Sequence, residues 1–147
     1  MNEEKERNRI LEGHERSTMI LDLLSRIPYN QKVRFYLRYG DNGHKEGWYD
    51  GILETLDNTG RCCEITYFDG GEWYRDWTAD VEDVRPYLRS LSDMTDAERK
   101  EYNEFEFIYA SHFGFVEDAV GLTEWLYSHG FDVHNLIPRN LAIEEKR

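Results

Sequence analysis

The chain has 147 residues, which suits one ordinary domain or a small domain with an appendage. Thirty Asp and Glu residues against eighteen Lys and Arg residues give a formal net charge of −12. This charge argues against duplex DNA or an anionic membrane as a partner, because either would need a local basic patch and the sequence shows none. No secretion signal and no apolar run of about 20 residues is found, so we expect a cytoplasmic protein without a membrane span.

The N-terminal part, residues 1–30, is expected to be a charged extension followed by an amphipathic helix. From Ser17 onward the large apolar residues recur at helical spacing, and Pro28 ends the pattern. The stripe predicted to be buried consists of Ile20, Leu23, Leu24 and Ile27.

Residues 31–90 have the pattern of a small antiparallel sheet. Short runs rich in β-branched and aromatic residues alternate with Gly, Asp and Asn. Gly60 and Gly70 stand where tight turns need a residue that tolerates positive φ. The pattern predicts five strands, with the third in the interior of the sheet, over residues 32–39, 47–56, 61–68, 72–77 and 84–88.

Two details of these strands lead to expectations about burial. Val33, Phe35 and Leu37 alternate with polar or charged neighbours, so we expect them on the buried face of the first strand. Cys62 and Cys63 are adjacent, and neighbouring strand residues point to opposite faces, which makes them poor disulfide partners. We therefore expect one core thiol, one surface thiol and a reducing compartment.

Three short motifs stand in this segment: Trp48-Tyr49-x-Gly51, Ile65-x-Tyr67-x-Asp69-Gly70 with Glu72 behind it, and Val84-Arg85-Pro86. Together they resemble the pattern of Tudor and Agenet domains, which are SH3-like barrels of the Royal superfamily. The resemblance covers roughly residues 32–89. It implies a twisted five-stranded barrel whose open end carries an aromatic cluster for reading a peptide, often one with methylated Lys or Arg.

Carried over residue by residue, the resemblance also implies an aromatic cage. Electron-rich ring faces attract a methylated ammonium, and each ring contributes roughly 0.5–2 kcal/mol. Where methyl-reading members commonly have a further aromatic residue, this chain has Asp69-Gly70-Gly71, so Trp73 or Trp77 would have to close the cage. Aromatic residues of a small barrel also serve as core or as a subunit interface, which leaves a homodimer open. The cage candidates are Tyr36, Tyr39, Trp48, Tyr49, Tyr67, Asp69 and Trp73.

Residues 91–147 are predicted to be α-helical and to pack on the barrel. Thr95 and Glu98 have the spacing of a capping box at a helix start. The helix that follows is expected to run to about Tyr109, and a second helix from about Val116 to Ser128. The first of these helices is expected to bury Tyr102, Phe105, Ile108 and Tyr109.

Three runs in this half, V-R-P-Y-L-R-S-L-S-D-M-T, E-W-L-Y-S-H-G-F-D and N-L-I-P-R-N-L-A-I-E, carry a second resemblance. They are similar to runs in uncharacterised small proteins of gut anaerobes and of their phages or mobile elements. The similarity implies no particular activity.

Catalytic patterns are absent from the sequence. The five histidines, at positions 14, 44, 112, 129 and 134, form no metal-ligand spacing, and the glycines stand at turns rather than in a phosphate-binding loop. We therefore expect no enzyme, no cofactor and no metal site.

The sequence thus predicts an α+β protein with a five-stranded SH3-like (Tudor-like) barrel, an N-terminal helix and a C-terminal helical cap. Its expected function is to bind a protein or peptide through aromatic residues at the barrel rim. The alternative is an acidic inhibitor, encoded by a phage or mobile element, that mimics nucleic acid toward a host protein. The acidic face for that alternative would comprise Asp96, Glu98, Glu101, Glu104 and Glu106.

Overall fold

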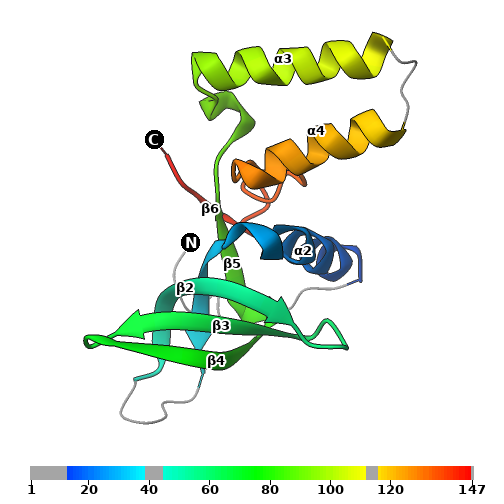
Figure 1. The fold of residues 1–147 in the computed structure, drawn as a ribbon. Coiled ribbons are helices and arrows are strands. Elements are labelled where there is room, and N and C mark those ends of the chain that lie inside the picture. The colour runs from blue at the N-terminus through cyan, green and yellow to red at the C-terminus, as the bar shows by residue number, and fades with distance from the viewer. Residues whose placement is uncertain (1–12, 39–44, 112–115, 147) are drawn as a thin grey trace. The chain divides into compact units, whose positions relative to one another are not determined.

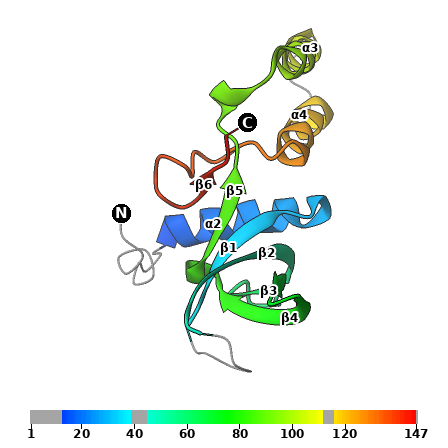
Figure 2. The same ribbon diagram turned by 90° about the vertical axis from the view of Figure 1, so that its left-hand side faces the viewer.

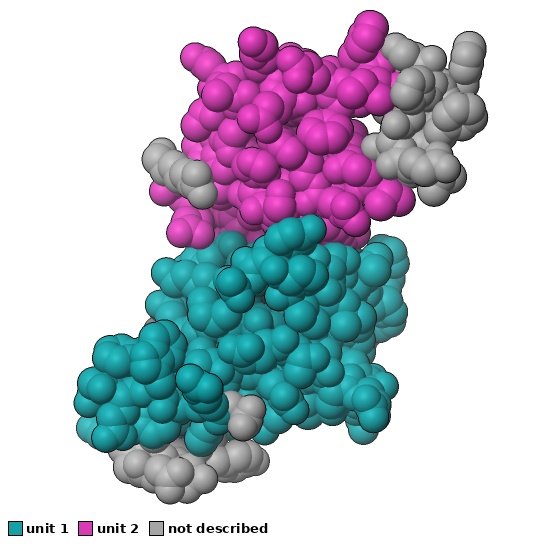
Figure 3. All heavy atoms as spheres, viewed as in Figure 1, with its two compact units in different colours: residues 1–87 teal, residues 88–147 magenta. Residues whose placement is uncertain are grey.

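The computed structural model describes residues 13–38, 45–111 and 116–146. The chain divides into two compact units, residues 1–87 and residues 88–147 (Figure 3). Its fold class is α+β, since helices and an antiparallel sheet are both present (Figure 1).

The sheet of the first unit is a series of antiparallel neighbours in the order β4-β3-β2-β1-β5. The predicted bounds of the second and fifth strands are confirmed, and the third strand is interior as expected. The fourth strand runs three residues further than predicted, to Asp80. The strands are β1 (Lys32–Leu37), β2 (Gly47–Leu56), β3 (Cys62–Asp69), β4 (Glu72–Asp80) and β5 (Val84–Leu88).

This sheet is open, and it does not form the closed five-stranded barrel that we expected. Register shifts between Leu53 and Thr55 in β2, and between Tyr74 and Trp77 in β4, bend both strands. The bends curve the sheet (Figure 2), yet among the described strands β4 is hydrogen-bonded to β3 alone. Closure needs a second partner for β4, and neither turn chemistry nor strand periodicity specifies one.

Helix α2 (Gly13–Arg26) lies beside the sheet in both ribbon views (Figures 1 and 2). It begins earlier than predicted, and its buried stripe is rotated from the predicted one. Leu23 is fully buried, but Leu24 is 47% exposed, while Asp22 and Arg26 are fully buried. The Asp22 carboxylate accepts hydrogen bonds from Arg26 Nε (2.8 Å) and Nη2 (3.0 Å), so the two charges are paired with each other. A pattern based on apolar residues alone does not predict a charged pair at these buried positions.

The inner side of the first unit is apolar. Val33, Phe35 and Leu37 are buried, which confirms the predicted alternation of the first strand. Cys63 is also fully buried and Cys62 is half-buried, as expected for adjacent residues on a strand. Two short 3-10 turns, η1 (Ile27–Tyr29) and η2 (Val81–Asp83), lead into β1 and β5.

The second unit contains helices α3 (Asp96–Ser111) and α4 (Val116–Ser128), which lie side by side (Figures 1 and 2). The predicted capping box is confirmed, because Glu98 N donates to Thr95 Oγ1 (3.1 Å) and Thr95 N donates to Glu98 Oε1 (2.9 Å). Ile108 was predicted to be buried but is 42% exposed. Phe107, its neighbour on α3, is 73% exposed, and the side chain of Tyr109 lies outside the described residues.

The remainder of the second unit is held by hydrogen bonds at both ends. The 3-10 turn η3 (Leu91–Asp93) precedes α3, and the short strand β6 (Ile143–Glu144) precedes Glu145, whose backbone N donates to Leu88 O (2.7 Å). None of the helices in residues 13–38, 45–111 and 116–146 has the length and apolar character that a membrane crossing requires.

Candidate functional site

The pairing of the strands divides the aromatic residues of the first unit between two faces of the sheet. Phe35 is paired with Tyr49 across β1 and β2, whereas the next pair is Tyr36 with Trp48. Because neighbouring residues on a strand point to opposite sides, these pairs lie on different faces. We call the face with Phe35 the inner face and the face with Tyr36 the outer face.

The inner face contains an aromatic cluster centred on Tyr67, which is fully buried. Its ring centroid lies 5.2 Å from Phe35 and 5.7 Å from Tyr49. It lies 5.2 Å from Tyr74 and 5.8 Å from Trp77. A ring surrounded in this way packs as core, and offers no open face to a ligand cation.

The other cage candidates do not join this cluster. Tyr36 is buried on the outer face with its ring centroid 5.2 Å from that of Trp48. Asp69 is half-buried at the end of β3, and Tyr39 lies outside the described residues. The candidates that the structure describes therefore occupy both faces and do not form one cage.

Among the cage candidates that the structure describes, Trp73 is the most open to solvent. It is 61% exposed, and Phe68, its cross-strand partner, is 55% exposed. Their ring centroids lie 5.2 Å apart in an edge-to-face arrangement. Two large apolar rings side by side at the surface are a feature that interaction sites share.

The β3–β4 turn explains why these two rings stand together. Gly70 and Gly71 have φ angles of 59° and 85°, which other residues reach only with strain. Two such residues form the tight turn whose twist matches that of the flanking strands. The turn therefore fixes Phe68 directly opposite Trp73 on the outer face.

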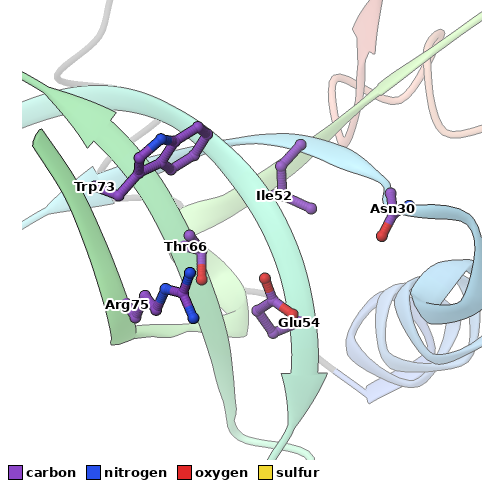
Figure 4. A pocket seen from close by; sticks show the side chains of 6 residues that line it. All are labelled: Asn30, Ile52, Glu54, Thr66, Trp73 and Arg75. Carbon is purple, nitrogen blue, oxygen red and sulfur yellow. The ribbon is translucent and has the colours of Figure 1, made fainter. Parts of the chain in front are cut away.

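A groove of about 500 Å³ begins at Trp73 and crosses the outer face (Figure 4). We call it the outer-face groove. Trp73 and Arg75 extend from β4, Thr66 from β3, and Ile52 from β2. The groove thus offers an aromatic ring, an aliphatic side chain, a hydroxyl and charges of both signs. Its lining residues are Asn30, Ile52, Glu54, Thr66, Trp73 and Arg75.

The acidic residues proposed as a nucleic-acid mimic lie on α3, and two of them are engaged inside the second unit. Glu98 accepts two hydrogen bonds of 2.7 Å from Arg89, and Glu101 accepts one of 2.9 Å from Trp125 Nε1. Glu98 is half-buried, and Asp96, Glu101, Glu104 and Glu106 are exposed. Since Asp96 and Glu98 are two residues apart on a helix, the five acids do not share one face.

Phe68 and Arg75 lie on the outer face but were not among the predicted site residues. The signal for Phe68 was present in the sequence, because a Gly-Gly turn after Asp69 makes Phe68 the cross-strand neighbour of Trp73. Arg75 follows Trp73 by two residues and therefore shares its face.

None of the protein-family models, curated proteins and solved structures that were compared with the chain matches it. Within residues 13–38, 45–111 and 116–146, no group of three His, Cys, Asp or Glu side chains is placed to hold a metal ion. The outer-face groove and the rings beside it are therefore the basis for assigning a function.

Proposed function

We propose that the chain is a non-enzymatic protein-interaction module that binds a segment of a partner protein in the outer-face groove. The observation that supports this most is the 61% exposure of Trp73, which lines that groove, and the 55% exposure of its cross-strand partner Phe68. Trp and Arg are enriched among residues that dominate binding energy at protein interfaces, and Arg75 lines the same groove. An SH3-like relationship is part of the proposal, supported by five antiparallel strands within the expected segment.

The groove has a size and a lining that suit a short segment rather than a large flat surface. Its volume of about 500 Å³ lies within the range of roughly 300–1,000 Å³ that is usual for ligand clefts. Ile52 is half-buried in its floor, and Glu54 and Arg75 are exposed at its sides. A bound segment would cover the Trp73 ring and meet polar groups that orient it.

The test is a selection of random peptides on the full chain, followed by affinity measurements on variants. Trp73→Ala is expected to weaken selected peptides by about 30-fold or more, as for an interface hot spot of at least roughly 2 kcal/mol. Phe107→Ala is the matched control, because Phe107 is an aromatic residue 73% exposed on α3, outside the groove. Circular dichroism confirms that both variants are folded.

A set of peptides that bind Trp73→Ala as tightly as the unmodified chain would contradict the proposal. Loss of binding in Phe107→Ala alone would move the binding surface to α3.

The acidic inhibitor is a second proposal with less geometric support. Two of its five acids, Glu98 and Glu101, already accept hydrogen bonds from Arg89 and Trp125. Mimicry of a nucleic acid requires a regular row of free charges, and the exposed acids of the five, Asp96, Glu101, Glu104 and Glu106, do not share one face of α3.

A further inference from the structure

We propose that the partner segment binds as an extended strand that adds to the free edge of β4, with an acidic residue facing Arg75 and an apolar residue facing Trp73. This inference rests on the proposed function, since it names the conformation and the chemistry of the segment that the outer face binds. In an antiparallel orientation, which is the more stable pairing, the segment reads acidic-x-apolar.

The first support is the position of β4 in the sheet. Strand β4 (Glu72–Asp80) has β3 as its hydrogen-bonded neighbour on one side and no described strand on the other. Backbone N–H and C=O groups on such an edge are a template for an added strand. In this mode of recognition, main-chain hydrogen bonds contribute affinity and alternate side chains contribute specificity.

The second support is the phase of the ladder. A two-residue turn makes the flanking pair, Asp69 and Glu72, a hydrogen-bonded pair, and the pair types then alternate along the strands. The backbone groups of Trp73 consequently point away from β3, toward the free edge. Trp73 and Arg75 are also the two residues of β4 whose side chains line the outer-face groove. One added strand can therefore pair with the backbone of Trp73 and contact the side chains of both residues.

The third support is the length of regular edge. The register shift between Tyr74 and Trp77 interrupts the ladder of β4, so that Arg75 is the first residue after the last regular pair, Tyr67 with Tyr74. A bulge of this kind blocks the long edge-to-edge pairing that leads to aggregation. It leaves the regular stretch of residues 72–74, followed by Arg75, which suits a short peptide strand.

The fourth support is charge. Arg75 is exposed and makes no ion pair within the part of the chain that the structure describes. An acidic side chain directly opposite it on an added strand gains a cross-strand ion pair worth roughly 0.2–1 kcal/mol. The residue two positions away on that strand lies opposite Trp73, where an apolar side chain covers the ring. The Arg75 charge and the exposed Trp73 ring thus predict a sequence pattern in the bound segment, and not apolar contact alone.

Backbone methylation of a selected peptide tests the strand directly. Methylation of the amide nitrogen at the residue facing Trp73 removes a donor to β4, so affinity is expected to fall at least tenfold. Methylation one residue away is the matched control, because that N–H points away from β4, and it is expected to change affinity less than threefold.

A charge exchange tests the acidic position. Arg75→Glu is expected to weaken an acidic-x-apolar peptide several-fold, and the same peptide with Lys in place of its acidic residue is expected to recover binding to that variant. Rescue of this kind does not arise from a change in folding.

The outcomes separate the two proposals. If binding requires Trp73 but both methylated peptides bind equally and the charge exchange gives no rescue, strand addition is overturned while the outer-face groove remains the binding site. If no selected peptide depends on Trp73, the proposed function fails first, and the inference fails with it.

Discussion

Glu98 shows how a single side chain can serve two structural purposes. It closes the capping box of α3 with Thr95 and also accepts two hydrogen bonds from the buried Arg89 guanidinium. The Arg89 hydrogen bonds, together with the backbone bond from Thr95, lower the pKa of Glu98 to about 2. Arg89 also stacks over Phe131 with 4.4 Å from its guanidinium carbon to the ring centroid, so the start of α3 is tied to the interior of its unit.

Glu98→Gln should therefore destabilise the second unit in a pH-dependent way. A lowered pKa in the folded state means that the stabilisation is present above the unfolded pKa of about 4.5 and is lost as pH falls toward 2. We expect a loss of about 2–3 kcal/mol at pH 7 and little difference from the unmodified chain near pH 2. Urea unfolding followed by the helical circular-dichroism signal measures it, with exposed Glu104→Gln as the control.

The two thiols should differ in reactivity. Burial raises the pKa of Cys63 to about 12, and burial together with Asp80 raises the pKa of Cys62. Because the thiolate is the reactive form, we expect the native protein at pH 8 to react with a disulfide reagent at one thiol, slowly, and the unfolded protein at two. Two rapidly reacting thiols in the native protein would show that Cys63 is not in the core.

At the scale of single residues, the sequence predicted the burial of some side chains and not of others. The opposite burial of Cys62 and Cys63 follows from strand alternation alone. The buried Asp22–Arg26 pair does not, because an i,i+4 acid–base pair is far more often solvent-exposed than central to a core. Tyr67 was predicted to lie at an accessible rim and is instead fully buried, since its contacts come from strands far apart in sequence.

Among the elements, the β2–β3 pairing depends on a close approach at Gly51. A Cβ atom at this position would lie 2.6 Å from Ile65 Cγ2 and 2.7 Å from the carbonyl oxygen of Thr66. The backbone of Thr66 belongs to the interior strand β3 and cannot move aside without breaking the ladder.

Gly51→Ala is accordingly expected to destabilise the first unit by about 2 kcal/mol or more. Gly121→Ala is the opposite case, because its Cβ would meet only Phe105 Cε1 at an ordinary 3.9 Å within α4. Alanine in a helix is favoured over glycine by roughly 0.5–1 kcal/mol, so this variant should gain stability. Thermal unfolding of the two variants measures both changes in stability, and equal changes would contradict the close packing at Gly51.

Elements were the most predictable level. The bounds of β2 and β5 and the capping box of α3 depend on turn and cap residues that act locally. Whether the sheet closes depends on the coiling of all strands together, and no local signal specified it. The outer-face groove lies between these cases. Strand alternation predicts that its residues share one face, but it does not predict how exposed they are.

For the whole molecule, the net charge of −12 and the outer-face groove make different predictions about salt. Binding through Trp73, with one ion pair at Arg75, should weaken less than about tenfold between roughly 50 and 500 mM salt. Association of an acidic mimic with a basic partner should weaken far more over that range, because it rests on many screened charges. Affinity measurements across salt concentrations distinguish the two modes.

The most direct test of the account is hydrogen–deuterium exchange of the full chain with and without a peptide selected on it. We predict slower exchange at the backbone amide of Trp73, because the added strand bonds to the outward groups of β4, and unchanged exchange in α3. Protection confined to α3, with β4 exchanging as in the free protein, would contradict it.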